Sequence, residues 1–537
     1  MKNLALSSSL KHLVFAGAFL FASCGSTAPI LSTPIENIDQ TPVKFSELTE
    51  IEKKGWSHFD LKKDTIPGVS LNLAYEQLVK PKSKTVIVAV IDSGIDITHE
   101  DLRNNIWVNE DEIPNNGIDD DNNGYIDDVN GWNFLGEANN EQLEFVRLLA
   151  TKNTSHPRYN EAQETYNKER KKYTELKQQY NSILEQINTA EKAVLNYLKK
   201  DSFTKDDIYS IETKDQTMSR HLSIIKQSYG FGYDTIEDLK EDLNKDLKSF
   251  NERLDYNLNI DFDGRSIVND DPNDLNDRNY GNNNVMPKEG RSHGTHVSGI
   301  IAATRNNGIG INGAANNVKI MAIRNTPNGD EYDKDVALGV YYAVDNGAKV
   351  INMSFGKGFS NHSDWVGDAI AYAAKKNVLI VSAAGNDGNN SDQIENYPND
   401  QIGTGAEISD TFLRVGATTN DYSSSLVAGF SNYGKSSVDV FAPGTEIYSS
   451  YPKNKYEFAQ GTSMASPLVA GIAALIFSQY PKLSAAQVKT ILMESGLPIQ
   501  KKVSLGNGST VEFSALCKSG KLVNAYNALI MASKLSK

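Results

Sequence analysis

One serine stands where nucleophilic chemistry is favoured. Ser463 lies in the segment GTSMASP at 461–467, directly before an apolar run at 468–477 that predicts a buried helix. The N–H groups at a helix N-terminus have no partners inside the helix, and they favour negative charge beside them. Ser463 is therefore a candidate nucleophile. A serine that only caps the helix is the alternative.

An aspartate and a histidine could assist this serine. Asp92 ends the run VIVAVID at 86–92, which is typical of a buried parallel strand, and open α/β sheets place their sites at the carboxyl ends of such strands. His293 begins the segment HGTHVSG, which leads into a small-residue, apolar helix. Each residue alone also fits a structural role, as a turn residue and as a helix-start or core histidine.

Together these three residues supply what acyl transfer by a serine needs. A hydroxyl is a poor nucleophile until a neighbouring base takes its proton. An imidazole base must be held in one tautomer and stabilised once it is charged, which is the task of a carboxylate. The chain therefore carries a candidate nucleophile in Ser463, a base in His293 and an orienting acid in Asp92.

The three segments carry a family resemblance. VIDSGID, HGTHVSG and GTSMASP resemble the active-site motifs of subtilisin-like serine proteases (subtilases, peptidase family S8), in the same chain order. The resemblance covers 81–136 and 286–537 and implies a three-layer α/β fold with a mainly parallel central sheet. It also implies a serine endopeptidase that forms an acyl-enzyme on Ser463, acts on proteins or peptides, and uses no organic cofactor.

The same resemblance assigns further site residues. The segment VINMSFG looks like the family strand that pairs with the substrate backbone beside the first specificity pocket, so Ser354, Phe355 and Gly356 are expected to bind substrate. The segment VSAAGND looks like the strand and loop that carry the oxyanion asparagine, which would be Asn386. A loop residue that tolerates a left-handed backbone is the alternative for Asn386.

The surrounding pattern agrees with an α/β fold. Strands are predicted at 318–324, 378–383 and 413–417, and helices at 335–345, 364–375 and 484–494. Strands that alternate with helices favour a parallel sheet covered on both faces.

The N-terminus predicts export. Lys2 and Lys11 precede an apolar run at 13–22 that is too short to span a membrane and suits a signal peptide, residues 1–23. The segment LFASCG resembles a bacterial lipobox, which predicts lipidation of Cys24 and an anchor in the cell envelope. A plain secretory signal is the alternative. Residues 24–80 are expected to form a tether and a short N-terminal arm, too short and polar for a folded prodomain.

A large insertion separates Asp92 from His293. Residues 137–285 contain two apolar stripes at helical spacing, from Tyr166 to Tyr197 and from Ile236 to Leu254. Because neither stripe can stay exposed, we expect an antiparallel helical hairpin or small bundle. It could restrict access to the cleft or dock a protein partner, or it could be a passive elaboration.

Two loops are candidate calcium sites with a structural role. The run DDDNNGYIDD at 119–128 has the oxygen spacing of an EF-hand-type loop, although Asn130 replaces its final glutamate; the candidate ligands are Asp119, Asp121, Asn123, Tyr125 and Asp127. The run NNGIGING at 306–313 resembles the family calcium loop, with candidate ligands Asp101, Asn307, Ile309 and Ile311. An Asx-rich turn and a glycine-rich turn are the respective alternatives.

Composition narrows the function classes. The formal net charge of the 537 residues is −14, and no basic stripe with interleaved aromatic residues is present, so we expect no nucleic-acid partner. Two alternatives to a general endopeptidase remain. One is a narrow-specificity protease that processes envelope or secreted proteins, and the other is an inactive scaffold that presents the helical insertion.

Overall fold

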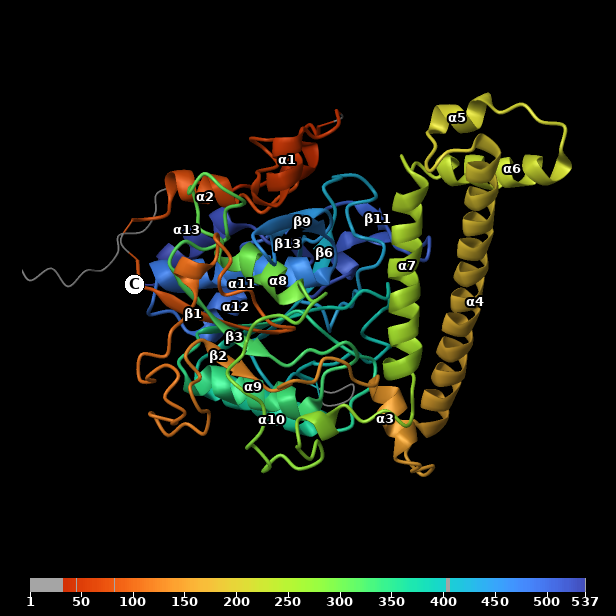
Figure 1. The fold of residues 1–537 in the computed structure, drawn as a ribbon. Coiled ribbons are helices and arrows are strands. Elements are labelled where there is room, and N and C mark those ends of the chain that lie inside the picture. The colour runs from red at the N-terminus through yellow and green to blue at the C-terminus, as the bar shows by residue number, and fades with distance from the viewer. Residues whose placement is uncertain (1–31, 45, 82, 402–405, 537) are drawn as a thin grey trace, which may run out of the picture.

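A central sheet with helices on both faces forms the main body of the protein (Figure 1). The computed structural model describes residues 32–44, 46–81, 83–401 and 406–536. The predicted signal peptide and the predicted lipidation site Cys24 lie outside these residues.

The sheet has nine strands in the order β10-β13-β7-β6-β5-β4-β1-β3-β2. All neighbouring strands are parallel except β10 and β13, which pair antiparallel at one end. The strands are β1 (Val86–Asp92), β2 (Gly131–Asn133), β3 (Val318–Arg324), β4 (Val350–Met353), β5 (Leu379–Ala383), β6 (Phe412–Thr418), β7 (Val440–Pro443), β10 (Leu497–Pro498) and β13 (Lys521–Leu522). Two hairpins lie outside this sheet, β8 (Ile447–Tyr451) with β9 (Lys455–Ala459), and β11 (Lys502–Ser504) with β12 (Thr510–Glu512).

Each face of the sheet packs against its own set of helices. One core contains side chains of α2 (Leu71–Gln77), α8 (His293–Ala302), α11 (Thr462–Gln479), α12 (Ala485–Glu494) and α13 (Ala525–Leu535). The other contains α9 (Asp333–Asp345) and α10 (Ser363–Lys375). Helix α11 is long and apolar enough to cross a membrane, but 94% of it is buried inside the protein. The predicted three-layer α/β fold with a mainly parallel sheet is confirmed.

The burial of the strands explains why this sequence forms a covered sheet. In β1, every residue from Val88 to Asp92 is buried. Runs of apolar, β-branched residues satisfy both covered faces of a parallel sheet, which is why these strands were recognisable without period-two alternation. The helix ends differ from expectation by one or two residues. For example, Ser484 is the capping residue of α12 rather than its first residue.

The N-terminal arm is part of the main body. It contains α1 (Glu50–Gly55) and α2, and Trp56, Leu61 and Val69 are 1%, 1% and 0% exposed. Ser70 donates a hydrogen bond to Asp60 at 2.6 Å and accepts one from Asn524 near the C-terminus at 2.7 Å. The described part of the predicted tether and arm therefore packs into the fold.

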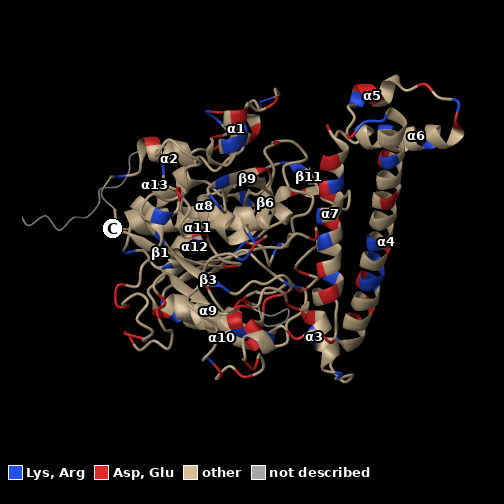
Figure 2. Cartoon of the chain, in the orientation of Figure 1, with Lys and Arg blue, Asp and Glu red and all other residues tan. Residues whose placement is uncertain are grey.

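A helical insertion projects from the main body between β2 and α8 (Figure 1). Its helices are α3 (Glu144–Ala150), α4 (Tyr159–Leu198), α5 (Lys205–Ser210), α6 (Gln216–Gly230) and α7 (Ile236–Glu252). Ile187, Val194, Leu239 and Leu243 meet in one apolar cluster between α4 and α7, so the two predicted stripes cover each other. Thr235 and Asp238 form the capping box that begins α7. Acidic and basic residues occur along both long helices, α4 and α7 (Figure 2).

Candidate active site

An aspartate and a histidine meet where β1 ends and α8 begins. Asp92 is the last residue of β1, and His293 is the first residue of α8. The Nδ1 atom of His293 lies 2.8 Å from Oδ1 and 2.9 Å from Oδ2 of Asp92, whose side chain is 1% exposed. A neutral imidazole bonded this way donates from Nδ1, which leaves Nε2 as the acceptor of a proton.

The carboxylate changes the basicity of this histidine. Burial by itself lowers the pKa of His293, but the charge of Asp92 and its hydrogen bond outweigh burial and raise the pKa of His293 above its ordinary value of 6.5. The side chain of His293 is 39% exposed, so it can be reached from the cleft. The pair therefore has the arrangement of a general base with an orienting acid.

Ser463 is the second residue of α11, at its N-terminal end. Its hydroxyl donates a hydrogen bond to the carbonyl oxygen of Ser354 at 2.9 Å, and the Ser354 hydroxyl donates to the carbonyl oxygen of Ser463 at 3.0 Å. Within the described residues, no hydrogen bond joins Ser463 to His293. A proton transfer from this hydroxyl to His293 would first require rotation of the Ser463 side chain about its Cα–Cβ bond, away from the Ser354 carbonyl.

Two hydrogen-bond donors face one point beside this serine. The Oδ1 atom of Asn386 accepts from the backbone N–H and the hydroxyl of Thr462, at 2.9 and 3.0 Å, which directs its Nδ2 away from the helix. A Cβ added to Gly461 would lie 3.5 Å from Nδ2 of Asn386 and 3.6 Å from the backbone nitrogen of Ser463. Gly461 has a φ of 148°, a backbone conformation that favours glycine.

A cleft of about 380 Å³ connects these groups. His293, Asn386, Ser354, Phe355 and Gly356 line it. The residue after Gly356, Lys357, pairs with Tyr397 through two backbone hydrogen bonds of 2.9 Å. Since successive residues of an extended segment direct their backbone polar groups to opposite sides, those of Gly356 point away from Tyr397, toward the cleft.

A buried hydrogen-bond chain under the serine was not anticipated from the sequence. Ser466 donates to Asn352 Oδ1 at 2.8 Å, and Asn352 donates to the Ser354 hydroxyl at 2.9 Å. Ser354 in turn contacts Ser463, so the chain links α11 to the segment that follows β4. Ser466 lies one helical turn after the candidate nucleophile, which is the signal in the sequence that could have indicated it.

The family model for the subtilase family matches residues 83–513 of this chain. The chain belongs to the subtilase family.

Several relatives of this subtilase are proteases by name. Thermitase of Thermoactinomyces vulgaris is 43% identical over 198 residues, which cover 37% of this chain and 65% of thermitase. Subtilisin DY of Bacillus licheniformis is 39% identical over 222 residues, which cover 41% of this chain and 76% of subtilisin DY. A cell wall-associated protease of Bacillus subtilis is 41% identical over 215 residues, which cover 40% of this chain and 22% of that protease. The matched part thus spans just under two thirds of thermitase and less than a quarter of the cell wall-associated protease.

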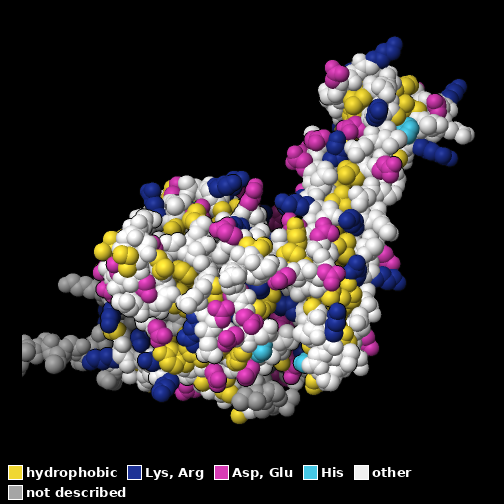
Figure 3. Space-filling view, turned by 60° about the horizontal axis from the view of Figure 1, so that its bottom comes forward, with side chains coloured by type: hydrophobic (Ala, Val, Ile, Leu, Met, Phe, Trp, Pro, Cys, Tyr) yellow, Lys and Arg dark blue, Asp and Glu magenta, His cyan; other side chains and the backbone are white. Residues whose placement is uncertain are grey.

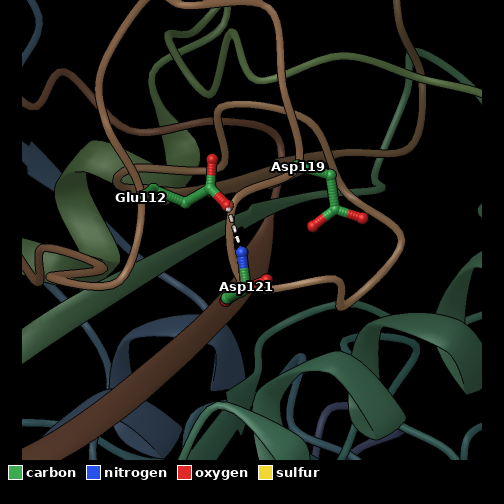
Figure 4. A group of neighbouring side chains, drawn as sticks. All are labelled: Glu112, Asp119 and Asp121. Carbon is green, nitrogen blue, oxygen red and sulfur yellow. Dashed lines mark hydrogen bonds between the residues drawn. The ribbon is translucent and has the colours of Figure 1, made fainter.

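The first candidate calcium loop of this subtilase gathers three carboxylates (Figure 4). Oxygen atoms of Glu112, Asp119 and Asp121 all lie within 4.8 Å of one another. Glu112 is 5% exposed, and its Oε1 accepts the N–H groups of Asp120 and Asp121. Its Oε2 is buried and has no hydrogen-bond partner among the described residues. Burial raises the pKa of Glu112. Sequence reasoning missed Glu112 because it lies outside the run 119–128.

The three other predicted ligands of this loop, Asn123, Tyr125 and Asp127, make separate contacts. The side-chain oxygen of Asn123 accepts the N–H of Tyr125 at 2.8 Å, and its amide donates to Asp121 at 3.0 Å. The ring of Tyr125 packs against Trp132. The carboxylate of Asp127 accepts the N–H groups at 116 and 117, at 3.1 and 3.0 Å, rather than joining the three-carboxylate group.

The structure brings the second set of candidate ligands together. The Asp101 carboxylate, 0% exposed, accepts from the Asn307 amide at 2.7 Å and from the backbone N–H of Ile311 at 3.2 Å. Ile309 donates its N–H to the side chain of Asn307 at 3.1 Å. Burial raises the pKa of Asp101, because a low-dielectric surrounding disfavours the charged carboxylate.

Proposed function

We propose that this subtilase is a serine endopeptidase whose nucleophile is Ser463. The observation that carries the proposal is the 2.8 Å contact between His293 Nδ1 and Asp92 in the cleft that also contains Asn386 and Ser354. Family membership supports serine protease chemistry in general. The assignment of individual residues rests on this geometry.

The proposed reaction has two halves. Ser463 Oγ attacks the scissile carbonyl carbon while His293 Nε2 accepts the hydroxyl proton, and Asp92 stabilises the resulting imidazolium. The carbonyl oxygen becomes an oxyanion that receives hydrogen bonds from Asn386 Nδ2 and the Ser463 N–H. His293 then protonates the leaving amine, which gives an acyl-enzyme. Water, deprotonated by His293, attacks that ester and releases the acid and the free serine.

The substrate would lie as an extended strand beside 354–356. The polar groups of Gly356 that point toward the cleft can pair with a peptide backbone, while Ser354 holds the end of the segment against Ser463. Pairing with backbone rather than side chains favours cleavage of many sequences. Selectivity among peptides must then come from the pockets beside the strand.

Hydrolysis of an internally quenched peptide library tests this proposal. We expect the full chain to cleave amide bonds, and Ser463→Ala to lose at least three orders of magnitude in kcat. Ser155→Ala, an exposed hydroxyl in the turn before α4, is the matched control and should keep full activity. Equal hydrolysis by wild type and Ser463→Ala would show that the proposed nucleophile is wrong.

A narrower role in processing envelope or secreted proteins is the alternative within enzymes. The base of the insertion touches the cleft wall, because Asn257 and Glu252 hydrogen-bond to Asn328 at 2.8 and 3.0 Å, next to cleft residue Gly329. If the insertion restricts access to the cleft, replacing 159–252 with a short linker should raise cleavage of a folded protein more than cleavage of a short peptide. An equal effect on both substrates would leave the insertion a passive elaboration or a docking site for a protein partner.

The remaining alternative is an inactive scaffold that presents the insertion. A scaffold requires no productive contact between Ser463 and His293, so it would not react with a fluorophosphonate. An enzyme would be labelled at Ser463, and unfolding the protein before the probe is added would prevent this labelling.

We further propose structural calcium at both loops. Buried carboxylate oxygens are ligands that Ca²⁺ prefers. The three carboxylates around Glu112 repel one another without a cation, and Glu112 Oε2 has no other partner. Glu112, Asp119 and Asp121 would hold one ion, and Asp101 with the loop at 307–311 a second. The ions would stabilise the fold, and no step of the reaction involves them.

The proposed location is the bacterial cell envelope, with a lipid on Cys24. The signal-like N-terminus and the lipobox support this placement, and one relative is named as cell wall-associated. Metabolic labelling with an alkyne fatty acid tests it. We expect label on the wild type and none on Cys24→Ala, and a labelled Cys24→Ala would contradict the anchor.

A further inference from the structure

A cavity next to the active-site cleft has a strongly acidic lining. Its volume is about 320 Å³. Five acidic residues are among those that line it: Glu331, Asp333, Asp364, Asp368 and Glu395. Glu331 also lines the cleft that contains His293 and Asn386, so the two spaces adjoin. Several acidic side chains lie on the face of the body that Figure 3 brings forward.

One lysine offsets only part of this charge. Lys357 lies 2.9 Å from Asp333 and 3.0 Å from Glu144, so it is already paired on both sides. Glu395 has Arg158 at 3.6 Å. In the part of the chain that the structure describes, no lysine or arginine nitrogen lies within 4 Å of the carboxylates of Glu331, Asp364 or Asp368.

Glu331 is the most constrained of these groups. It is 2% exposed, and its Oε1 is buried without a hydrogen-bond partner in the described part of the chain. Its backbone carbonyl is fixed by Lys357 at 2.7 Å and Arg147 at 3.0 Å. Burial raises the pKa of Glu331 to about 7, against the lowering effect of Lys357. A buried, unpaired carboxyl group of this kind is stabilised by an incoming cation with N–H donors.

The position of the cavity relative to the scissile bond follows from its lining residue Lys357. Ser354 contacts Ser463, and Lys357 follows three residues later along the segment beside which the substrate would lie. An extended chain advances about 3.3 Å per residue, so Lys357 lies about 10 Å further along, level with the fourth substrate residue before the scissile bond. This segment resembles the family strand beside the first specificity pocket, which takes the residue on the acyl side of the scissile bond, so the occupant would belong to that side.

We propose that this cavity selects an arginine or lysine side chain at the fourth substrate position before the scissile bond. The inference rests on the proposed peptidase function and adds a substrate preference to it. A guanidinium or ammonium group would bind Glu331 at the inner end and Asp364 and Asp368 on α10. The cavity volume suits a long side chain, and the excess of carboxylates disfavours an acidic one.

The test compares peptides that differ by one charge. Blocked peptides with arginine or its neutral isostere citrulline at the fourth position share all other residues, and mass spectrometry fixes the cleavage site. We expect kcat/KM at least tenfold higher for arginine. The double change Asp364→Asn and Asp368→Asn should reduce this ratio at least threefold, and Glu331→Gln should reduce it further. The double change should leave kcat/KM for the citrulline peptide unchanged.

The controls separate this inference from the function on which it rests. Glu494→Gln removes an exposed carboxylate of α12, outside the cavity, and should keep the wild-type ratio. Efficient cleavage with equal kcat/KM for arginine and citrulline would overturn the inference and leave the peptidase intact. A preference for arginine over citrulline that persists in all the cavity variants would also overturn the inference. Absence of cleavage of all peptides, together with no fluorophosphonate label on Ser463, would overturn the peptidase function itself.

Discussion

Two histidines lie one turn apart in α8 and differ in their exposure, their hydrogen-bond partners and the direction of their pKa shift. His293 faces the cleft and contacts Asp92, which raises its pKa. His296 is 3% exposed and lies 3.1 Å from the carbonyl oxygens of Ile447 and Glu457, and burial lowers its pKa to about 4. A neutral His296 that donates from Nε2 ties α8 to the β8–β9 hairpin. The carboxylate neighbour, rather than the imidazole, distinguishes the base from the structural residue.

The pH dependence of catalysis should report His293. Because the imidazole must be neutral to accept the serine proton, kcat/KM should fall as the pH falls through a pKa above 6.5. Asp92→Asn removes the charge that raises this pKa, so the inflection should move to lower pH and kcat should drop on the order of 10⁴-fold. Asp410→Asn, an exposed control, should change neither. An inflection that stays in place in Asp92→Asn would contradict the pairing.

Asn386 should act on kcat rather than on KM. Removing one oxyanion donor reduces kcat on the order of 10²–10³-fold, because the hydrogen bond forms fully only in the transition state. We expect this loss in Asn386→Ala with a nearly unchanged KM, measured on a cleaved peptide. Asn361→Ala, an exposed asparagine outside the cleft, is the control. A change confined to KM would assign Asn386 to ground-state binding instead.

At the scale of elements, the insertion is held together by its own apolar seam. Leu243 of α7 is 8% exposed and belongs to the cluster that also contains Ile187 and Val194 of α4. Leu243→Ala should cost about 2–5 kcal/mol of local stability. Hydrogen exchange should then accelerate in α4 and α7 but not in β1 or α11. Glu241→Ala, exposed on the same helix, should have no such effect, and an equal acceleration across the whole chain would contradict an independent seam.

The sequence predicted elements better than it predicted which elements meet. The central strands were evident because covered parallel strands leave continuous apolar runs, and the paired stripes of α4 and α7 were evident because helical seams leave a periodic pattern. The N-terminal arm was harder, since Trp56 and Leu61 are sparse apolar residues without a period, and they are buried only through contacts distant in the chain.

The candidate site shows the same limit. Asp92, His293 and Ser463 stand in compact motifs, so their types and order could be read along the chain. Glu112 and Asn352 could not be assigned this way, because their partners are brought to them by loops and by a neighbouring strand. The residues next to Glu112 and Asn352 in the sequence do not reveal their roles, because those roles depend on contacts that form only when the chain folds.

At the scale of the whole molecule, the two candidate calcium sites should couple the stability of the fold to calcium. A ligand present at 100 times its dissociation constant stabilises the folded state by about 2.7 kcal/mol. A chelator should therefore accelerate heat inactivation several-fold. Glu112→Gln should remove part of this sensitivity and Asp101→Asn another part, because the sites are separate. Identical half-lives with and without the chelator in the wild type would remove calcium from the account.

The most direct measurement of the central claim maps the site of covalent reaction. The intact protein is treated with a fluorophosphonate, digested, and sequenced by mass spectrometry. The proposed triad predicts one adduct, on Ser463, that forms in the wild type and is lost in His293→Ala. An adduct on another serine, or equal labelling of Ser463 in His293→Ala, would contradict activation of this serine by the His293–Asp92 pair.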